Sequence, residues 1–560
     1  MTDLPTTITD ALAAARSTDQ PVFTTLFDEA RVRGLAEQAG TGPLAGIPFV
    51  AKDNIDVEGV PTTAGCPTRT APAVAHAGAV RALLDAGAVP IGKSNLDQFA
   101  TGLVGTRSPY GACHSVASAA HVSGGSSSGS AVAVASGIVP LALGTDTAGS
   151  GRVPAAFNGI VGMKPTRGLV STAGVVPACP SLDCVTTFTR DVAAARVAFD
   201  ALARFDAGTP WSRPMPAAAP AGVARWMRVI AVPDAPLDLD EPHRVAWEAA
   251  LAHAATIAHL VPVDITPFLD AARLLYSGPF VAERLAAFGH ELTPDGTHLD
   301  PTVRKIVLGG ASITGADVFA GLDQLERLRA VAWQTFIGAD ALLLPVTPGH
   351  PTLADVAADP VGANSRLGTY TNMVNLLDLC AIAVPAGTRP DGLPFGVQFI
   401  APAFADRPLL DLGSRWTGEP VAEPDPTPGH TRLAVVGAHL SGQPANPQLL
   451  ALGGKLHARA RTAGGYRLYR VPGPFPRPGL IPGDGPADGI ELEVWELPNQ
   501  GLGALLPTIA VPLGLGPVRL DDGRIVTGFV ADSTGVDTAT SDITAHGGWR
   551  AYLRSSDSGH

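Results

Sequence analysis

The sequence predicts a large α/β domain over residues 1–416 and a small, mainly β domain over residues 431–560. Between about residues 44 and 200, short apolar runs alternate with alanine-rich stretches, which is the pattern of an α/β fold. Hydrophobic residues make up 46% of the 560 and charged residues 16%, which excludes a disordered chain or a coiled coil. The proline-rich residues 417–430 cannot continue a helix or a central strand, so they predict a linker between the domains.

Periodicity predicts the elements of the first domain in chain order. Residues 8–40 show two amphipathic helical periods separated by a turn at residues 19–21, and we expect the second helix to start near Thr24. Residues 240–340 are mainly helical in pattern. Apolar runs predict strands at residues 47–51, 89–91, 138–143, 228–232, 341–346, 381–384 and 396–400, and alanine-rich stretches predict helices at residues 79–86 and 130–136.

The second domain shows the alternation of apolar and polar residues that is typical of half-buried strands. Loops rich in glycine and proline separate these runs. Strands are expected at residues 432–436, 466–471, 490–497 and 525–531, and a short helix at residues 549–556. The pattern therefore predicts a separate β domain.

Charge and cysteine usage exclude several classes of protein. The formal net charge is −12, and because acidic and basic side chains balance in residues 431–560, the excess lies in residues 1–430. A nucleic-acid-binding protein has the opposite sign. The acidic N-terminal residues do not match a signal peptide, and no apolar run reaches the length of about 18 residues that a membrane span needs. The five cysteines, with no Cys-x-x-Cys pair, are expected to be reduced in the cytoplasm.

Two short stretches match known sequence signatures, but each lacks the structural context that its signature needs. Residues 87–94 fit the nucleotide P-loop pattern, but a helix precedes them and Val-Pro-Ile fills the loop. Residues 125–129 fit the nucleophile elbow of serine hydrolases, with Ser127 as nucleophile, but residues 114–121 are too polar for the buried strand that must lead into an elbow. We therefore discount nucleotide binding and Ser127 as a nucleophile.

Residues 122–167 carry a dense series of small-residue motifs. They contain Gly-Gly-Ser-Ser, Gly-Thr-Asp, Gly-Ser-x-Arg-x-Pro and Gly-x-Lys-Pro-Thr, and further segments lie at residues 48–54, 92–100 and 393–398. A lone GGSSSGS run is typical of a flexible linker, but this run is flanked by apolar segments. In order and spacing the motifs closely resemble the amidase signature family, over roughly residues 8–415. The resemblance implies an α/β/α sandwich with a central mixed sheet.

The resemblance implies that Ser150 is the nucleophile, Ser126 a bridging serine that follows a cis peptide bond, and Lys52 the base. A serine hydroxyl needs a base, and a lysine can serve at neutral pH only when burial lowers its pKa. Lys52 follows the apolar run Ile-Pro-Phe-Val-Ala, which fits that requirement. By the same resemblance, the backbone N–H groups of Thr147, Ala148, Gly149 and Ser150 form an oxyanion hole.

Two local features narrow the substrate. The Ala148-Gly149 pair before the nucleophile resembles the allophanate hydrolases of the family, and Tyr276 with Arg284 resembles their substrate-recognition pair; Gly124 is a further expected substrate contact. A guanidinium binds a carboxylate through two parallel hydrogen bonds, which suits the carboxylate of allophanate. The alternative for Arg284 is a solvated arginine paired with Glu283 or Glu291 on a helix face.

The second domain resembles the C-terminal domain of allophanate hydrolases, which is related in fold to γ-glutamylcyclotransferases. The segments that carry this resemblance are residues 433–442 and 491–497. The resemblance implies that this domain processes the carboxylated product of the first. His439, beside a glycine-rich strand end, is the candidate site residue, although a single histidine is more often structural.

Together these features predict hydrolysis of allophanate to ammonia and carbon dioxide in nitrogen metabolism. No cofactor is expected, because no cluster of His, Cys and carboxylates has metal-ligand spacing. The expected partners are the small substrate, a second copy in a homodimer and a urea carboxylase of the same pathway, with no nucleic acid and no membrane. The alternatives are an amidase of another small amide and the ammonia-producing subunit of a tRNA-dependent amidotransferase.

Overall fold

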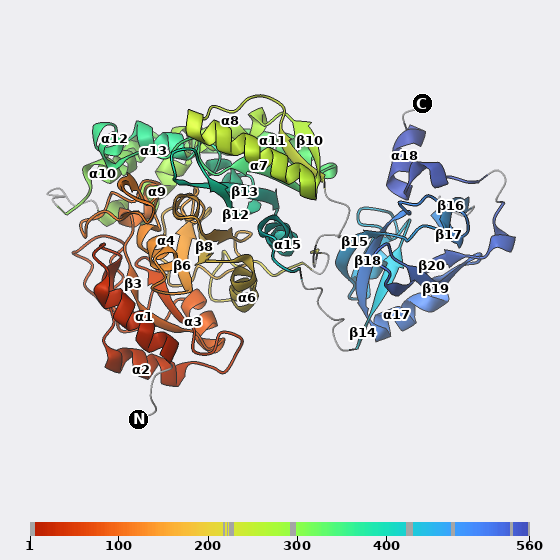
Figure 1. Ribbon diagram of the computed structural model, residues 1–560, viewed down its shortest axis with the longest axis horizontal. Coiled ribbons are helices and arrows are strands. Elements are labelled where there is room, and N and C mark those ends of the chain that lie inside the picture. The colour runs from red at the N-terminus through yellow and green to blue at the C-terminus, as the bar shows by residue number, and fades with distance from the viewer. Residues whose placement is uncertain are drawn as a thin grey trace. The chain divides into compact units, whose positions relative to one another are not determined.

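The computed structural model describes residues 6–216, 219–220, 222, 229–291, 298–421, 429–471, 477–537 and 541–557. The chain separates into two compact units. The first consists of residues 1–215 and 229–420, and the second mainly of residues 421–560. Figure 1 shows that each unit contains its own sheet and its own helices.

The first unit is built on a mixed sheet of eleven strands in the order β1-β3-β2-β6-β8-β7-β12-β13-β11-β9-β10, and β4 and β5 form a separate hairpin. Its strands are β1 (Phe23–Leu26), β2 (Pro48–Lys52), β3 (Val89–Ser94), β4 (His114–Ser115), β5 (Ser118–Val122), β6 (Leu141–Asp146), β7 (Val161–Lys164), β8 (Cys184–Thr189), β9 (Val229–Pro233), β10 (His259–Val263), β11 (Ala341–Pro345), β12 (Leu379–Thr388) and β13 (Pro394–Pro402). The strands β3, β2 and β6 are neighbours and run parallel.

Helices pack along this sheet: α4 contacts β2 and β6, α6 contacts β8, and α15 contacts β12 and β13. The helices are α1 (Thr6–Ser17), α2 (Glu29–Gln38), α3 (Gly78–Asp85), α4 (Ser128–Ala135), α5 (Val153–Asn158), α6 (Val192–Leu202), α7 (Glu241–Ile257), α8 (Thr266–Ser277), α9 (Phe280–Phe288), α10 (Pro301–Gly309), α11 (Gly315–Ala332), α12 (Leu353–Ala358), α13 (Gly362–Leu367), α14 (Asn372–Leu376) and α15 (Asp406–Thr417). The predicted α/β fold with a central mixed sheet is confirmed.

Two stretches differ from the sequence-based expectation. Between α1 and α2 the chain forms β1, so Thr24 lies in a strand and the second helix begins at Glu29, after its N-cap Asp28. The strand forms because it pairs antiparallel with β3, a partner that lies far away in the sequence. Likewise, β10 interrupts the stretch 240–340, which was expected to be helical, because it pairs in parallel with β9.

The two discounted signatures lie in ordinary structure. The P-loop pattern runs from the end of α3 into β3, whose residues are all buried. Residues 114–121 fall on β4 and β5, the hairpin outside the main sheet, so no buried strand leads into Ser127. Among the described residues no single helix is both long and apolar enough to cross a membrane, and one bent pair, Pro301–Ser312 with Gly315–Ile337, passes by length and composition alone.

The first unit extends to the residues that follow α15. Trp416 is buried against Phe399, and its indole N–H donates to the carbonyl of Pro385 at 2.8 Å. The Glu419 carboxylate accepts hydrogen bonds from the first two backbone N–H groups of α6, at 3.0 and 2.8 Å. Half of the predicted linker, residues 422–428, lies outside the described residues.

The second unit is mainly β, as predicted. Its strands are β14 (His430–Val435), β15 (Lys455–Arg461), β16 (Tyr466–Val471), β17 (Arg477–Pro482), β18 (Glu491–Pro498), β19 (Leu513–Arg519) and β20 (Ile525–Ala531), and its helices are α16 (Asn446–Ala451), α17 (Asn499–Leu505) and α18 (Trp549–Asp557). Five strands form a sheet in the order β15-β18-β14-β20-β19, and β16 pairs with β17. The core contains the buried indoles of Trp495 and Trp549.

Candidate active site

The parallel strands β3, β2 and β6 bring distant motifs to one edge of the sheet. Parallel neighbours end at the same edge, so the residues that follow them are neighbours in space. Lys52 is the last residue of β2, and β6 leads directly into residues 147–150. The carboxyl end of β3 leads into residues 95–105 at the same edge. The fold therefore gathers three of the sequence motifs at one place.

Lys52 is fully buried and hydrogen-bonded through its side chain. Its Nζ lies 2.8 Å from Ser126 Oγ and 2.7 Å from Thr145 Oγ1. Burial lowers the pKa of Lys52 to about 7, against the attraction of the buried carboxylates Asp97, Asp183 and Asp146, which raises it. A substantial fraction of the amine is therefore neutral near pH 7 and able to accept a proton.

The first two serines of the Gly-Ser-Ser-Ser run have different surroundings. Ser126 follows the cis peptide bond from Gly125 and contacts Lys52. Ser127 is fully buried, and its hydroxyl donates to the Thr145 carbonyl at 3.1 Å and accepts from the Thr145 N–H at 3.3 Å. The Ser127 hydroxyl is thus engaged by the backbone of β6.

A buried ion pair closes the loop that carries Ser150. Asp146 and Arg152, on either side of the loop, meet through two hydrogen bonds of 3.0 Å, and both side chains are fully buried. The Asp146 carboxylate also accepts from the N–H of Gly151 at 3.0 Å. Arg152 reaches on to Gln398 in β13 at 2.9 Å. The pair therefore fixes both ends of the loop to the sheet.

The loop presents backbone donors beside Ser150. Among the described residues, the N–H groups of Ala148, Gly149 and Ser150 have no hydrogen-bond acceptor. Gly149 has a φ of 146°, and a Cβ atom there would lie 2.4 Å from Thr371 Oγ1, so glycine is required. This arrangement leaves the N–H groups available to an oxyanion.

Residues 101–103 connect the predicted site residues. The Ser150 hydroxyl donates to the Gly102 carbonyl at 3.4 Å, and the Gly125 N–H donates to the Leu103 carbonyl at 2.8 Å. Arg284 Nη1 donates to Thr101 Oγ1 at 3.2 Å. One short segment therefore holds the nucleophile loop, the bridging-serine loop and Arg284 together.

Arg284 is buried inside the first unit, only 1% exposed, and its guanidinium carbon lies 5.5 Å from the centre of the half-buried Tyr276 ring. Its Nε has no hydrogen-bond partner among the described residues. The alternative of a solvated helix-face arginine is wrong, because Glu283 binds Ser181 and Glu291 pairs with Arg69. A buried guanidinium with a free donor is suited to an anionic ligand.

Gly124 lies at a crowded point beside the cis bond. Its φ is 75°, and a Cβ atom would lie 2.9 Å from the Cα of Pro154. The structure gives Gly124 this backbone role, and its contact with substrate stays a prediction.

Sequence reasoning missed several polar residues that hold the site. Thr145 contacts Lys52, Asp97 accepts from the N–H groups of Gly105 and Arg107, and Asp183 binds the Thr147 hydroxyl. Burial raises the pKa of Asp183 to about 6, against the hydrogen bonds that lower it. Thr145 stands in the quoted Gly-Thr-Asp motif, whereas no local pattern marks Asp183.

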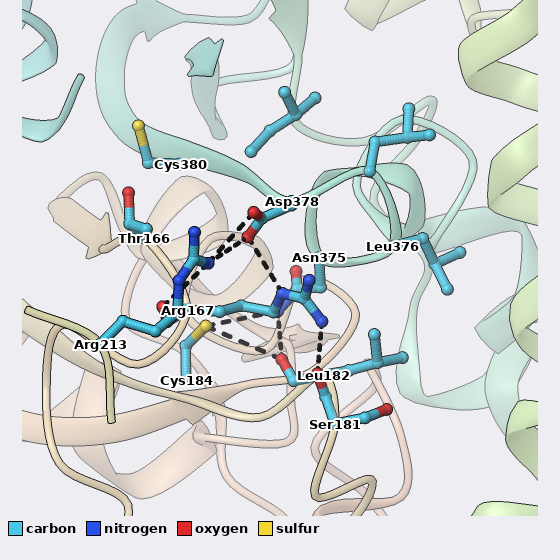
Figure 2. A network of polar contacts seen from close by, with 12 residues as sticks. Thr166, Arg167, Ser181, Leu182, Cys184, Arg213, Asn375, Leu376, Asp378 and Cys380 are labelled. Atoms are coloured by element: carbon cyan, nitrogen blue, oxygen red, sulfur yellow. Dashed lines mark hydrogen bonds and ion pairs between the residues drawn. The ribbon is translucent and has the colours of Figure 1, made fainter. Parts of the chain in front are cut away.

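Figure 2 shows a polar network around Arg167, Asn375 and Asp378. Arg167 contacts both Asp378 and the Ser181 carbonyl, and Arg213 Nη1 pairs with Asp378 at 2.8 and 3.1 Å. Asn375 donates to the Leu182 carbonyl at 3.0 Å. It also donates to the Asp146 carbonyl at 2.8 Å. The network thereby fixes the chain around Asp183, which in turn holds Thr147.

His439 belongs to the second unit. Its ring stacks on Phe529 with centroids 4.9 Å apart, and its Nε2 lies 3.0 Å from Gln448 Oε1. Among the residues that the structure describes, no group of three or more His, Cys, Asp or Glu side chains could hold a metal ion.

Known proteins match both units of the chain. Residues 431–554 match the model of the allophanate hydrolase C-terminal domain. A urea amidolyase of Lachancea kluyveri is 42% identical over 91% of this chain, and this chain spans 30% of that relative's length. The structure of Kluyveromyces lactis allophanate hydrolase superposes with a TM-score of 0.75 at 38% identity, covering 98% of this chain and 97% of that one.

A more distant relative matches the first unit. A glutamyl-tRNA(Gln) amidotransferase subunit of Symbiobacterium thermophilum is 37% identical over 66% of this chain and 82% of its own length. The amidase family model matches residues 6–410, which include every residue of the Lys52, Ser126 and Ser150 constellation. This chain therefore belongs to the amidase family.

Proposed function

We propose that this protein is an amide hydrolase that converts allophanate to ammonia and carbon dioxide. The observation that carries the proposal is the buried Lys52 amine, 2.8 Å from Ser126, at the sheet edge where residues 101–103 bind both Ser150 and Arg284. The likeness to an allophanate hydrolase along nearly the whole chain supports the substrate. The match to the allophanate hydrolase C-terminal domain favours this function over that of an amidotransferase component.

The proposed chemistry is acyl transfer through Ser150. Its hydroxyl attacks the amide carbonyl while its proton passes to Ser126, which gives its own proton to neutral Lys52. The free N–H groups of Ala148, Gly149 and Ser150 stabilise the oxyanion. The relay then returns a proton to the leaving nitrogen, ammonia departs, and water hydrolyses the ester on Ser150.

Arg284 and Tyr276 give the site its preference for a carboxylate. The guanidinium is buried and has a free Nε–H donor among the described residues, so a substrate carboxylate supplies the missing acceptor. The half-buried tyrosine ring restricts where the guanidinium can lie. Allophanate carries such a carboxylate next to its amide.

The second unit completes the reaction in this proposal. Hydrolysis of the allophanate amide leaves a nitrogen that carries two carboxylates. The second unit converts this molecule to ammonia and carbon dioxide, with His439 as its site residue.

We further propose that the chain forms a homodimer in the cytoplasm and that a urea carboxylase supplies its substrate. The apolar side chains of Phe319 and Leu322, exposed one turn apart on α11, support self-association. The five buried, unpaired cysteines support a reducing compartment.

The purified chain is expected to release ammonia from allophanate faster than from glutamine or simple amides. Ser150→Ala should abolish this release, and Ser126→Ala and Lys52→Ala should each lower the rate by about 100-fold or more, since they remove general-base assistance. Ser127→Ala is the matched control, and it should cost about 1–3 kcal/mol of stability through its lost backbone hydrogen bonds while activity remains. An active Ser150→Ala enzyme, or ammonia from glutamine alone, would contradict the proposal.

The pH dependence of kcat/KM should report the lowered pKa of Lys52. Below a pH of about 7 the amine is an ammonium that cannot accept the Ser126 proton, so the rate should fall about tenfold per pH unit and level off above that pH. The residual rate of Lys52→Ala should lack this limb. A limb near the ordinary lysine value of 10.5 would contradict the lowered pKa, and the same limb in Lys52→Ala would show that Lys52 is not the base.

Replacing Arg284 should affect a carboxylated substrate selectively. Arg284→Ala should lower kcat/KM for allophanate by about 10- to 100-fold, because a charge-assisted hydrogen bond contributes about 1.5–3 kcal/mol. A neutral amide of similar size should be hydrolysed at a nearly unchanged rate, and Arg284→Lys should recover part of the loss. An equal loss on both substrates would assign Arg284 a structural role.

A chain truncated after Pro420 should fold and release ammonia, because it retains Trp416 and the Glu419 cap of α6. Carbon NMR should show that the carboxylated intermediate accumulates in the truncated chain, and His439→Ala in the full chain should give the same result. The exposed His546 in the same unit supplies the control His546→Ala, which should leave the products unchanged. Identical product time courses in all of these proteins would mean that the second unit takes no part in the chemistry.

A further inference from the structure

Thr371 brings a hydroxyl to the loop that carries Ser150. Its side chain is fully buried, and its Oγ1 has no hydrogen-bond partner among the described residues. A Cβ atom built on Gly149 would lie 2.4 Å from this oxygen, 2.8 Å from Thr371 Cβ and 3.3 Å from Cγ2, so the hydroxyl is the part of the side chain that faces the loop. Because a carbon–carbon bond is about 1.5 Å long, Oγ1 lies within about 4 Å of the Gly149 Cα.

The fold itself makes no use of this hydroxyl. Thr371 is the N-cap of α14, a position where a threonine side chain usually accepts a hydrogen bond from a backbone N–H of the first turn. In the described part of the chain its side chain makes neither this bond nor one to a backbone carbonyl of the preceding turn. A buried hydroxyl without a partner costs free energy, which points to a ligand that supplies the partner.

One guanidinium fixes Thr371 to the loop. Arg152, the cation of the buried ion pair, donates from Nη2 to the Thr371 carbonyl at 3.1 Å. Gln398, which binds Arg152 through its amide oxygen, donates from Nε2 to the Tyr370 carbonyl at 2.7 Å. The place of the hydroxyl beside Gly149 is therefore set by the contacts that also hold the loop.

The groups already assigned to the substrate are all hydrogen-bond donors. The N–H groups of residues 148–150 are available to the oxyanion, and the guanidinium of Arg284 to the carboxylate. Allophanate also carries an N–H between its two carbonyl carbons, one bond from the carbon that Ser150 attacks. A donor buried in the site needs an acceptor, and the oxygen of the Thr371 hydroxyl can accept.

We propose that Thr371 is a specificity-determining residue of the first unit, whose Oγ1 accepts a hydrogen bond from the substrate N–H next to the reacting carbonyl. This inference rests on the proposed function, because it names the part of allophanate that Thr371 contacts. The contact favours a urea-type substrate over an amide with carbon at that position. No proton is transferred in it, since Ser126 and Lys52 move the proton while Thr371 holds the acyl part of the substrate.

The test compares allophanate with malonamate, in which a methylene group replaces this N–H while the amide and the carboxylate remain. Thr371→Val removes the hydroxyl with little change of shape, and it should lower kcat/KM for allophanate by about tenfold and leave that for malonamate nearly unchanged. Thr371→Ser keeps a hydroxyl and should retain the preference for allophanate. Thr187→Val is the matched control, because it removes from β8 another buried hydroxyl without a partner among the described residues, and it should change neither rate.

Binding to the Ser150→Ala chain, measured by calorimetry, gives a readout that needs no turnover. In that chain Thr371→Val should weaken the binding of allophanate by about tenfold and that of malonamate much less. An equal loss for both compounds would assign Thr371 a structural role, and no loss for either would show that the hydroxyl does not contact the substrate, so each result overturns the inference. Failure of the unaltered chain to release ammonia from allophanate would instead contradict the proposed function, because the binding ratio tests Thr371 separately.

Discussion

The site depends on one buried ion pair, between Asp146 and Arg152. Two fully buried charges are stable only when they meet with good geometry and additional hydrogen bonds, and here they are joined by two hydrogen bonds and further satisfied by Gly151 and Gln398. Because the two residues stand on either side of residues 147–151, the pair sets the shape of the loop that presents Ser150. Loss of either partner would leave an uncompensated buried charge next to the nucleophile.

The same edge of the sheet imposes a second constraint, the burial of Lys52. Desolvation lowers the pKa of the amine to about 7, while Asp97, Asp183 and Asp146 oppose this shift by their charge. The balance keeps the amine near the point where it exchanges protons at neutral pH. The parallel strands β2 and β6 make the arrangement possible because they end together, with Thr145 of β6 in contact with Lys52.

The sequence alone determined the α/β class, the mainly β tail and most of the strands of the sheet, since these follow from local periodicity. It also indicated Lys52, Ser126 and Ser150, because the motifs that contain them are dense and ordered. Their close approach is a property of the tertiary structure, in which parallel strands end together. The structure confirms the placement of Lys52 beside Ser126, and their catalytic roles stay predictions.

Features that depend on contacts between residues far apart in the sequence were decided only by the tertiary structure. The strand β1 forms because β3 pairs with it, although its own sequence continues a helical pattern. The carboxylate Asp183 reaches Thr147 only through the folded chain, so no local motif marks it. For Arg284, sequence neighbours favoured a surface ion pair with Glu283 or Glu291, but those carboxylates bind Ser181 and Arg69 instead. Helical spacing shows which side chains share a face, and only packing decides whether that face meets water or the interior.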